Sequence, residues 1–213
     1  LPKDYLAYKL SGTFATDVSD ASGTLYFDVK NRTWSKEMCE ICSIKPEWLP
    51  KVFESFEKIG TLVPSIASEL GIPGTLKADL AAELGLSDKV VIAAGAGDNA
   101  AAAVGMGIIG NGGCNISLGT SGTIFISSEK FGVDANNALH SFAHADGYYH
   151  LMGVVLSAAS CNKWWMEEII GTTDYVKEQE GLEALGTNKV FFLPYLMGER
   201  SPHNNPDARA MFI

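Results

Sequence analysis

The stretch that decides the fold reads Lys89-Val-Val-Ile-Ala-Ala94, then Gly95-Ala-Gly97, then Asp98-Asn-Ala-Ala-Ala-Ala-Val-Gly105. The first six residues predict a buried strand, because they are mostly branched or small apolar residues. The two glycines indicate a turn, and the alanine-rich run predicts a helix from Asp98 to about Gly107. The segment is therefore a strand, turn and helix with an acidic residue at the helix start.

The spacing Gly95-x-Gly97-x-x-Ala100 matches a dinucleotide-binding turn only superficially. A pyrophosphate would occupy the helix N-terminus, where Asp98 already places a negative charge. No acidic residue follows a further strand, roughly 20 residues on, to hold a ribose. The sequence also has no Gly-Lys pair, which excludes a Walker motif.

Asp98 has two interpretations at this point. A carboxylate at a helix start would stay ionised and accept a proton from a hydroxyl group. Aspartate is also a favoured N-cap, and the local pattern alone favours that structural role.

A composition shift near residue 108 predicts a domain boundary, with two hairpins after it. In the first, Cys114–Leu118 and Thr123–Ser127 flank Gly119-Thr120-Ser121-Gly122, whose backbone N–H groups and hydroxyls could surround a phosphate. A simple turn explains this pattern equally well. The second hairpin covers His140 to Met152 and turns at Ala145-Asp-Gly147, with Asp-Gly as a two-residue turn.

Capping residues and apolar periodicity predict the remaining elements. They are a helix from Pro2 to Leu10 that stops at Ser11-Gly12, a Ser35-capped helix, a helix through Leu76 and Leu84, helices at about 156–170 and 174–185, and a strand from Lys189 to Leu193. Trp164-Trp165 and Phe191-Phe192 are expected in the core.

The chain has 213 residues, of which 46% are hydrophobic, enough for one large domain or two smaller ones. A net charge of −9 argues against nucleic acid and anionic membranes, so a small molecule is the expected partner. No secretion signal is recognisable, and the cytoplasm is the default location. The start at Leu1 without methionine suggests a fragment.

The sequence does not predict a metal site. Cys39 and Cys42 have zinc-like spacing, but no second pair completes the ligand set. His140, His144 and His150 fall on one hairpin with only Asp146 nearby, which makes zinc the less favoured interpretation.

Taken together, Ala94 to Gly105 followed by Ser117-Leu-Gly-Thr-Ser-Gly122 resembles the central segment of the FGGY carbohydrate kinases, particularly the xylulokinases among them. Further stretches that look like the same family occur in the same order. They are Leu1–Tyr5 through Asp17–Gly23, His150–Gly153 with Ser157–Ser160, and Pro194–His203.

The resemblance implies an α/β fold of the actin-like ATPase (ribonuclease H-like) type, with two domains flanking a cleft and both incomplete in this chain. Residues 1–108 would be the latter half of the N-terminal domain, and 109–213 the first half of the C-terminal one. It also implies that Asp98 is the catalytic base and binds the sugar with Asn99. Gly119, Thr120 and Ser121 would contact ATP phosphates.

The implied reaction is ATP- and Mg²⁺-dependent phosphorylation of D-xylulose to D-xylulose 5-phosphate. Kinases of ribulose, glycerol or gluconate, and a non-catalytic sugar- or nucleotide-binding relative, remain open alternatives. The N-terminal phosphate loop and the C-terminal adenosine motif of the family are not found, so this polypeptide alone is expected to be inactive. A homodimer remains open as the assembly.

Overall fold

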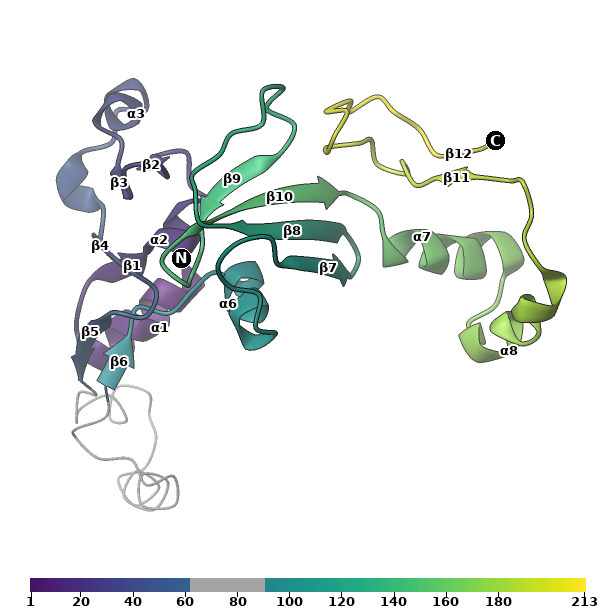
Figure 1. Cartoon of the computed structure of the whole chain (residues 1–213), viewed down its shortest axis with the longest axis horizontal. Coiled ribbons are helices and arrows are strands. Elements are labelled where there is room, and N and C mark those ends of the chain that lie inside the picture. Colours follow the sequence, from purple (N-terminus) through teal and green to yellow (C-terminus); the bar gives the residue numbers. More distant parts are fainter. Residues whose placement is uncertain (62–90) are drawn as a thin grey trace, which may run out of the picture. The chain divides into compact units, whose positions relative to one another are not determined.

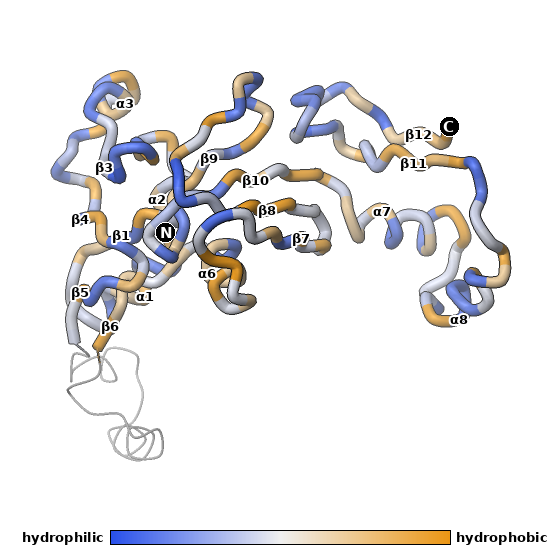
Figure 2. Tube along the Cα trace, viewed as in Figure 1, coloured by the Kyte–Doolittle hydropathy of each residue, from blue (hydrophilic) through white to orange (hydrophobic). Residues whose placement is uncertain are grey.

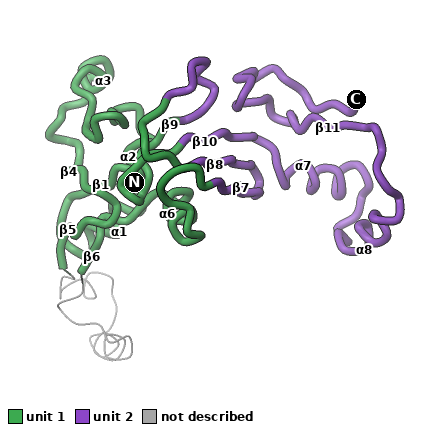
Figure 3. Tube along the Cα trace, viewed as in Figure 1, with its two compact units in different colours: residues 1–113, 127–132, 141–150 green, residues 114–126, 133–140, 151–213 purple. Residues whose placement is uncertain are grey.

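A computed structural model describes residues 1–61 and 91–213 of the chain (Figure 1). The helix predicted through Leu76 and Leu84 lies outside these residues. The chain divides into two compact units (Figure 3), the first formed by residues 1–113, 127–132 and 141–150, and the second by 114–126, 133–140 and 151–213. In the described ranges, none of the helices has the length and apolar character needed to cross a membrane.

The first unit contains most of the short elements. In chain order they are α1 (Pro2–Ser11), β1 (Ala15–Asp17), α2 (Val18–Ala21), β2 (Phe27–Asp28), β3 (Thr33–Trp34), α3 (Lys36–Ile41), the 3-10 turn η1 (Pro46–Trp48), β4 (Lys51–Phe53), β5 (Lys58–Thr61), β6 (Val91–Ala93) and α6 (Asp98–Gly105). Gly12 ends α1 in a left-handed conformation, with φ of 72°, and the Ser35 side chain caps α3 by accepting from the N–H of Met38. The glycine end of α1 and the serine cap of α3 both agree with the prediction.

Two small apolar clusters form the core of this unit. Ala7 of α1, Ala15 of β1 and Ile59 of β5 are buried together with Ala94. The second cluster joins Val18 and Ala21 of α2 to other buried side chains, namely Phe27 and Ala143. Strand β1 pairs in parallel with β4, and β5 pairs antiparallel with β6. Helix α2 follows β1 directly and α6 follows β6, so these two pairings help to position the starts of both helices.

A strand does form within the predicted range Lys89–Ala94, but the prediction that it is buried is wrong. The described strand β6 is Val91–Ala93, and Val91 is 55% exposed. Within the part of the chain that the structure describes, β6 pairs with β5 alone, and its Ile92 packs partly buried against the cluster of Ala7, Ala15 and Ile59. Ala94, immediately after the strand, is itself buried in that cluster.

The two predicted hairpins belong to one four-stranded sheet. Its strands are β7 (Cys114–Leu118), β8 (Gly122–Ser128), β9 (His140–Ala143) and β10 (Tyr149–Val155), in the order β7-β8-β10-β9. The second hairpin closes with three residues rather than the predicted two, because the N–H of His144 donates to the carbonyl of Tyr148 at 2.9 Å. Gly147 in this turn has φ of 95°, a conformation that favours glycine.

The rest of the second unit is more fragmented than the sequence predicts. It consists of α7 (Ala159–Trp164), the π-helical turn η2 (Trp165–Ile170), α8 (Tyr175–Gln179), the 3-10 turn η3 (Leu182–Leu185), β11 (Phe192–Leu193) and β12 (Met211–Phe212). The helix predicted over 174–185 is interrupted at Gly181, which has φ of 76°. The strand predicted from Lys189 begins only at Phe192.

The expectation that the tryptophan and phenylalanine pairs form a core is wrong. Trp165 is 39% and Phe191 71% exposed. Trp164 and Phe192 stack with ring centroids 6.2 Å apart and line a pocket of about 750 Å³ in the second unit. Figure 2 shows hydrophobic residues along β8 and near β12. Trp164, Trp165 and Phe192 therefore line an apolar pocket, together with Phe212.

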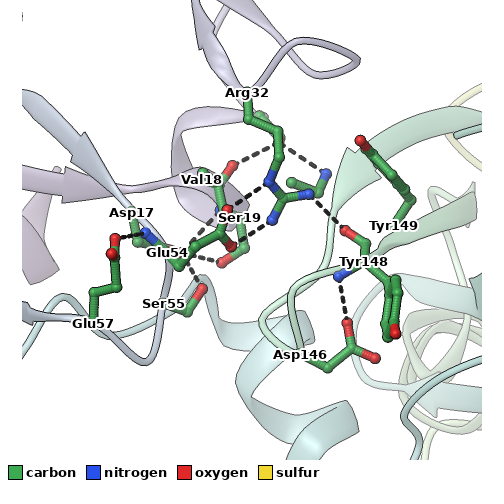
Figure 4. Close-up of polar contacts among 12 residues, drawn as sticks. Asp17, Val18, Ser19, Arg32, Glu54, Ser55, Glu57, Asp146, Tyr148 and Tyr149 are labelled. Atoms are coloured by element: carbon green, nitrogen blue, oxygen red, sulfur yellow. Dashed lines mark hydrogen bonds and ion pairs between the residues drawn. The ribbon is translucent and has the colours of Figure 1, made fainter. Parts of the chain in front are cut away.

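An arginine joins three segments of the first unit (Figure 4). The Arg32 guanidinium donates to both oxygens of the Glu54 carboxylate, at 2.6 and 2.5 Å, and to the carbonyl of Tyr148 at 2.9 Å. It also lies 5.2 Å from the centroid of the Tyr149 ring. Burial alone would lower the pKa of Arg32, but the hydrogen bonds and charge of Glu54 outweigh it and raise that pKa. This two-pronged geometry is specific to arginine.

We predict that Arg32→Ala lowers the free energy of unfolding by about 2 kcal/mol, since it removes several hydrogen bonds to a charged group. Urea denaturation of the full-length protein measures the change. Lys45→Ala is the control, because the Lys45 side chain is exposed and contacts the Trp48 ring, and a loss below about 1 kcal/mol is expected. Equal losses in the two variants would contradict the prediction.

Candidate active site

Asp98 is the first residue of α6, and its side chain is exposed. The N-cap of α6 is Gly97, so Asp98 does not have the capping role that the local pattern favours. One oxygen of Asp98 accepts the backbone N–H of Asn99 at 2.7 Å and the side-chain amide of Asn99 at 3.1 Å. The structure therefore brings together the two residues predicted to bind sugar and presents the carboxylate to solvent.

The chain before Asp98 makes a tight turn that needs glycine. Gly95 has φ of 80°, and a Cβ atom there would lie 3.1 Å from the Cδ atom of Lys3. Its N–H donates to the carbonyl of Ser55 at 3.0 Å, and the N–H of Ala94 donates to the carbonyl of Glu57 at 3.0 Å. These bonds hold the exit of β6 against the segment that precedes β5.

A buried carboxylate lies beneath this turn (Figure 4). The side chain of Asp17 is 0% exposed and ends β1. One of its oxygens accepts the hydroxyls of Ser19 and Ser55, each at 2.6 Å, and the other lies 3.0 Å from the Lys3 ammonium. A buried charge is stable only when it is paired and hydrogen-bonded in this way.

Lys3 and Ser19 connect the buried carboxylate to the turn. The Lys3 ammonium donates to the carbonyl of Ala94 at 3.2 Å, and the Ser19 hydroxyl accepts the N–H of Gly97 at 3.0 Å. Burial alone would lower the pKa of Lys3, but bonds and charges of Asp4 and Asp17 outweigh it and raise that pKa. Burial raises the pKa of the neighbouring Asp20, because water is displaced from its carboxyl group.

Sequence reasoning missed this network. The residues from Asp17 to Gly23 stood out only as a stretch that resembles the family. A local signal existed, since aspartate is a favoured N-cap, and Asp17 does cap α2 by accepting the N–H of Ser19 at 2.8 Å. The contacts with Lys3, Ser55 and Gly97 have no local signal.

The predicted phosphate-binding turn lies in the second unit. Residues 119–121 connect β7 to β8 and are exposed. The carbonyls of Gly119 and Thr120 accept N–H groups from Ala159 and Ala158, at 2.8 and 2.9 Å. The N–H of Gly119 bonds within the turn to Ser121, whereas those of Thr120 and Ser121 have no backbone partner in the described residues. Two donors are thus available at an exposed hairpin end.

Two histidines of the second hairpin lie buried next to each other. His144 and His150 are 0% and 2% exposed, with ring centroids 5.6 Å apart. Burial, and then the charge of His144, lowers the pKa of His150 to about 3. Over residues 1–61 and 91–213, no group of three His, Cys, Asp or Glu residues could hold a metal ion. Cys39 is buried in α3, and both Cys39 and Cys42 are free thiols.

Comparison with known proteins identifies the family to which the chain belongs. Residues 1–76 match the N-terminal domain of the FGGY family of carbohydrate kinases, and residues 114–213 match its C-terminal domain. The chain belongs to the FGGY family of carbohydrate kinases. The fold is the actin-like ATPase fold of this family.

The similarity extends over the whole chain. A xylulose kinase from Klebsiella pneumoniae is 42% identical over 218 residues, which cover 100% of this chain and 41% of the relative. Among solved structures, a xyloylose kinase from Brucella ovis is 39% identical with a TM-score of 0.83, covering 100% of this chain and 41% of that one. A gluconate kinase from Lactobacillus acidophilus is 25% identical with a TM-score of 0.82, covering 99% and 41%. The chain thus spans about two fifths of the length of these relatives.

We predict that Gly95→Ala destabilises the protein by about 1 to 3 kcal/mol, since an L side chain is strained at this φ and meets Lys3. Urea denaturation measures the loss. Gly132→Ala is the matched control, because its Cβ atom would meet open space and Gly132 has no positive φ. The prediction fails if Gly95→Ala is as stable as Gly132→Ala.

Proposed function

We propose that the protein transfers the γ-phosphoryl group of ATP to a hydroxyl of D-xylulose, forming D-xylulose 5-phosphate and ADP. The observation that carries this proposal is the exposed carboxylate of Asp98 at the start of α6, hydrogen-bonded to Asn99. The xylulose kinase from Klebsiella pneumoniae, at 42% identity over the whole chain, supports the choice of sugar.

In this mechanism Asp98 orients the sugar hydroxyl and accepts its proton. The hydroxyl oxygen forms a bond to the γ-phosphorus while the bridging bond of ATP breaks, and ADP leaves with that electron pair. The transition state is loose, so the proton moves late and a carboxylate is a sufficient base. Positioning of the hydroxyl supplies much of the rate enhancement. Asn99 would hold a second sugar oxygen through its amide.

The turn of Gly119, Thr120 and Ser121 would contact the phosphates of ATP. Its two available N–H groups suit a phosphate oxygen, and such backbone donors bind anions without a positive side chain. Mg²⁺ is proposed as the ion that accompanies ATP. The described residues contain no cluster of three acidic, histidine or cysteine ligands for it, so no step is assigned to this chain through the metal.

We also propose a domain division, a cellular location and an assembly for the protein. We place the latter half of the N-terminal kinase domain at residues 1–108 and the first half of the C-terminal domain at 109–213, flanking a cleft. The cytoplasm is the proposed location, because ATP is available there. A homodimer is an assembly that mass measurement in solution would test.

A second candidate function is phosphorylation of another sugar or polyol. The gluconate kinase from Lactobacillus acidophilus, which shares the fold with a TM-score of 0.82, favours gluconate as an alternative. Coupled ADP release by the full-length protein with xylulose, ribulose, glycerol and gluconate separates these cases. Turnover that is fastest on xylulose supports the proposal. Sugar binding without turnover on any substrate would indicate a non-catalytic relative.

We predict that Asp98→Asn lowers kcat by about 10²- to 10⁴-fold, the range that general-base catalysis contributes. The amide cannot accept the hydroxyl proton, although its shape is nearly unchanged. Coupled ADP release from the full-length protein measures kcat.

Asp174→Asn is the control for this variant. Asp174 is also an exposed aspartate at a helix start, where its side chain accepts the N–H of Lys177 at 3.1 Å. Asparagine caps helices equally well, so full turnover is expected. An unchanged kcat in Asp98→Asn would remove Asp98 from the role of base.

We also predict that Ser121→Ala raises KM for ATP about three- to tenfold and leaves KM for the sugar unchanged, as the loss of one hydrogen bond allows. Steady-state kinetics with each substrate varied in turn measures both constants. Ser128→Ala, at the other end of β8, is the control, since the hydroxyl of Ser128 donates to the carbonyl of Lys130 and accepts the N–H of the same residue. A KM effect on the sugar instead of ATP would contradict the assignment of the turn.

A further inference from the structure

We propose that Ser19 is a positioning residue for Asp98: its hydroxyl links the buried carboxylate of Asp17 to the backbone of Gly97 and so sets where the base stands. This inference rests on the proposed function, because it assumes that Asp98 accepts the sugar proton. Ser19 itself touches neither substrate nor reacting atoms in this proposal.

The two bonds of the Ser19 hydroxyl have opposite directions. It donates its proton to Asp17 at 2.6 Å and accepts the N–H of Gly97 at 3.0 Å. A hydroxyl has one proton, and the buried carboxylate can only accept, so the lone pairs of Ser19 are left for Gly97. The N–H of Gly97 can only donate, so the Ser19 hydroxyl uses its proton for Asp17 and a lone pair for Gly97. Ser19 is only 6% exposed, so water competes little for either bond.

Four hydrogen bonds hold the residues that precede the base, and one of them runs from the N–H of Ala94 to the carbonyl of Glu57. In the other three, the carbonyl of Ala94 accepts from Lys3, the N–H of Gly95 donates to the carbonyl of Ser55, and the N–H of Gly97 donates to Ser19. The side chains of Lys3, Ser19 and Ser55 all contact Asp17 as well. Three of the four bonds therefore lead to residues that contact one buried carboxylate.

Gly97 is the last of these attachments before the helix. It is the N-cap of α6, and the next residue is Asp98. A change in the position of the Gly97 N–H moves the Cα atom of Asp98, whose own side chain is held only by Asn99 within the described segments. A misplacement of a catalytic group by about 1 Å can lower the rate roughly 10²-fold. Loss of the Ser19 contact is therefore expected to lower kcat strongly even where the protein stays folded.

Ser22 offers a matched control on the same short helix. Its hydroxyl also donates one bond, to the carbonyl of Val18 at 2.7 Å, and accepts one, from the N–H of Ala143 at 3.0 Å. Ser22 is 7% exposed, close to the 6% of Ser19. The two serines therefore differ in which backbone N–H they bind and in their acceptor, which is a buried carboxylate for Ser19 and a backbone carbonyl for Ser22.

The test compares Ser19→Ala, Ser22→Ala, Asp98→Asn and the double variant Ser19→Ala/Asp98→Asn in the full-length protein. We expect Ser19→Ala to lower kcat about 10- to 100-fold with KM for the sugar changed less than about threefold, and Ser22→Ala to keep kcat within about twofold. Ser19→Ala should lower the urea midpoint more than Ser22→Ala, because it removes a hydrogen bond to a buried carboxylate, so kcat is compared under conditions where both variants are folded. In the double variant Ser19→Ala should have no further effect on the residual turnover, because the base it positions is gone.

Equal kcat losses in Ser19→Ala and Ser22→Ala, or full additivity in the double variant, would overturn the positioning role while the function stands. Undiminished turnover of Asp98→Asn would instead overturn the proposed function itself. If Ser19→Ala does not fold, Ser19→Cys replaces it. The cysteine thiol keeps most of the volume of the serine side chain but is a weak donor and acceptor. The kcat of Ser19→Cys is then compared with that of Ser22→Ala in the same way.

Discussion

The first unit depends on the hydrogen bonds and the ion pair that compensate the buried carboxylate of Asp17. Transferring a charge into a protein interior is costly unless hydrogen bonds and an opposite charge compensate for it. Here one ammonium and two hydroxyls do so, and they come from α1, α2 and the segment before β5. The Lys3 ammonium and the Ser19 hydroxyl also contact the backbone of residues 94–97, and the carbonyl of Ser55 accepts the N–H of Gly95. The residues that compensate the buried charge therefore also position the chain that leads into α6.

The second unit forms its part of the proposed site differently. Its turn at residues 119–121 is held through backbone carbonyls that accept from the first residues of α7 and the residue before it. Binding a phosphate with N–H groups requires no basic side chain, which agrees with a chain whose net charge is −9. The backbone before the proposed base is held by a buried ion cluster, whereas the proposed phosphate-binding turn is held by hairpin geometry.

Family membership and sugar choice are separate matters. Solved kinases named for xyloylose and for gluconate match this chain with TM-scores of 0.83 and 0.82, so the fold does not distinguish the sugars. Discrimination must come from side chains that contact the sugar, among which Asn99 is the proposed one. Its amide already bonds to Asp98, so sugar contact and base position are coupled through one side chain.

The sequence by itself determined the features that close within a few residues: the glycine end of α1, the Ser35 cap, both hairpins and Asp98 at a helix start. Caps and turns satisfy their own hydrogen bonds locally, so their residues indicate them directly. Only the tertiary structure decided that Ser19 binds Gly97, 78 residues away, and that Lys3 binds Ala94, 91 residues away. It also decided the exposure of Val91 and Phe191, since burial depends on which distant segments cover a residue.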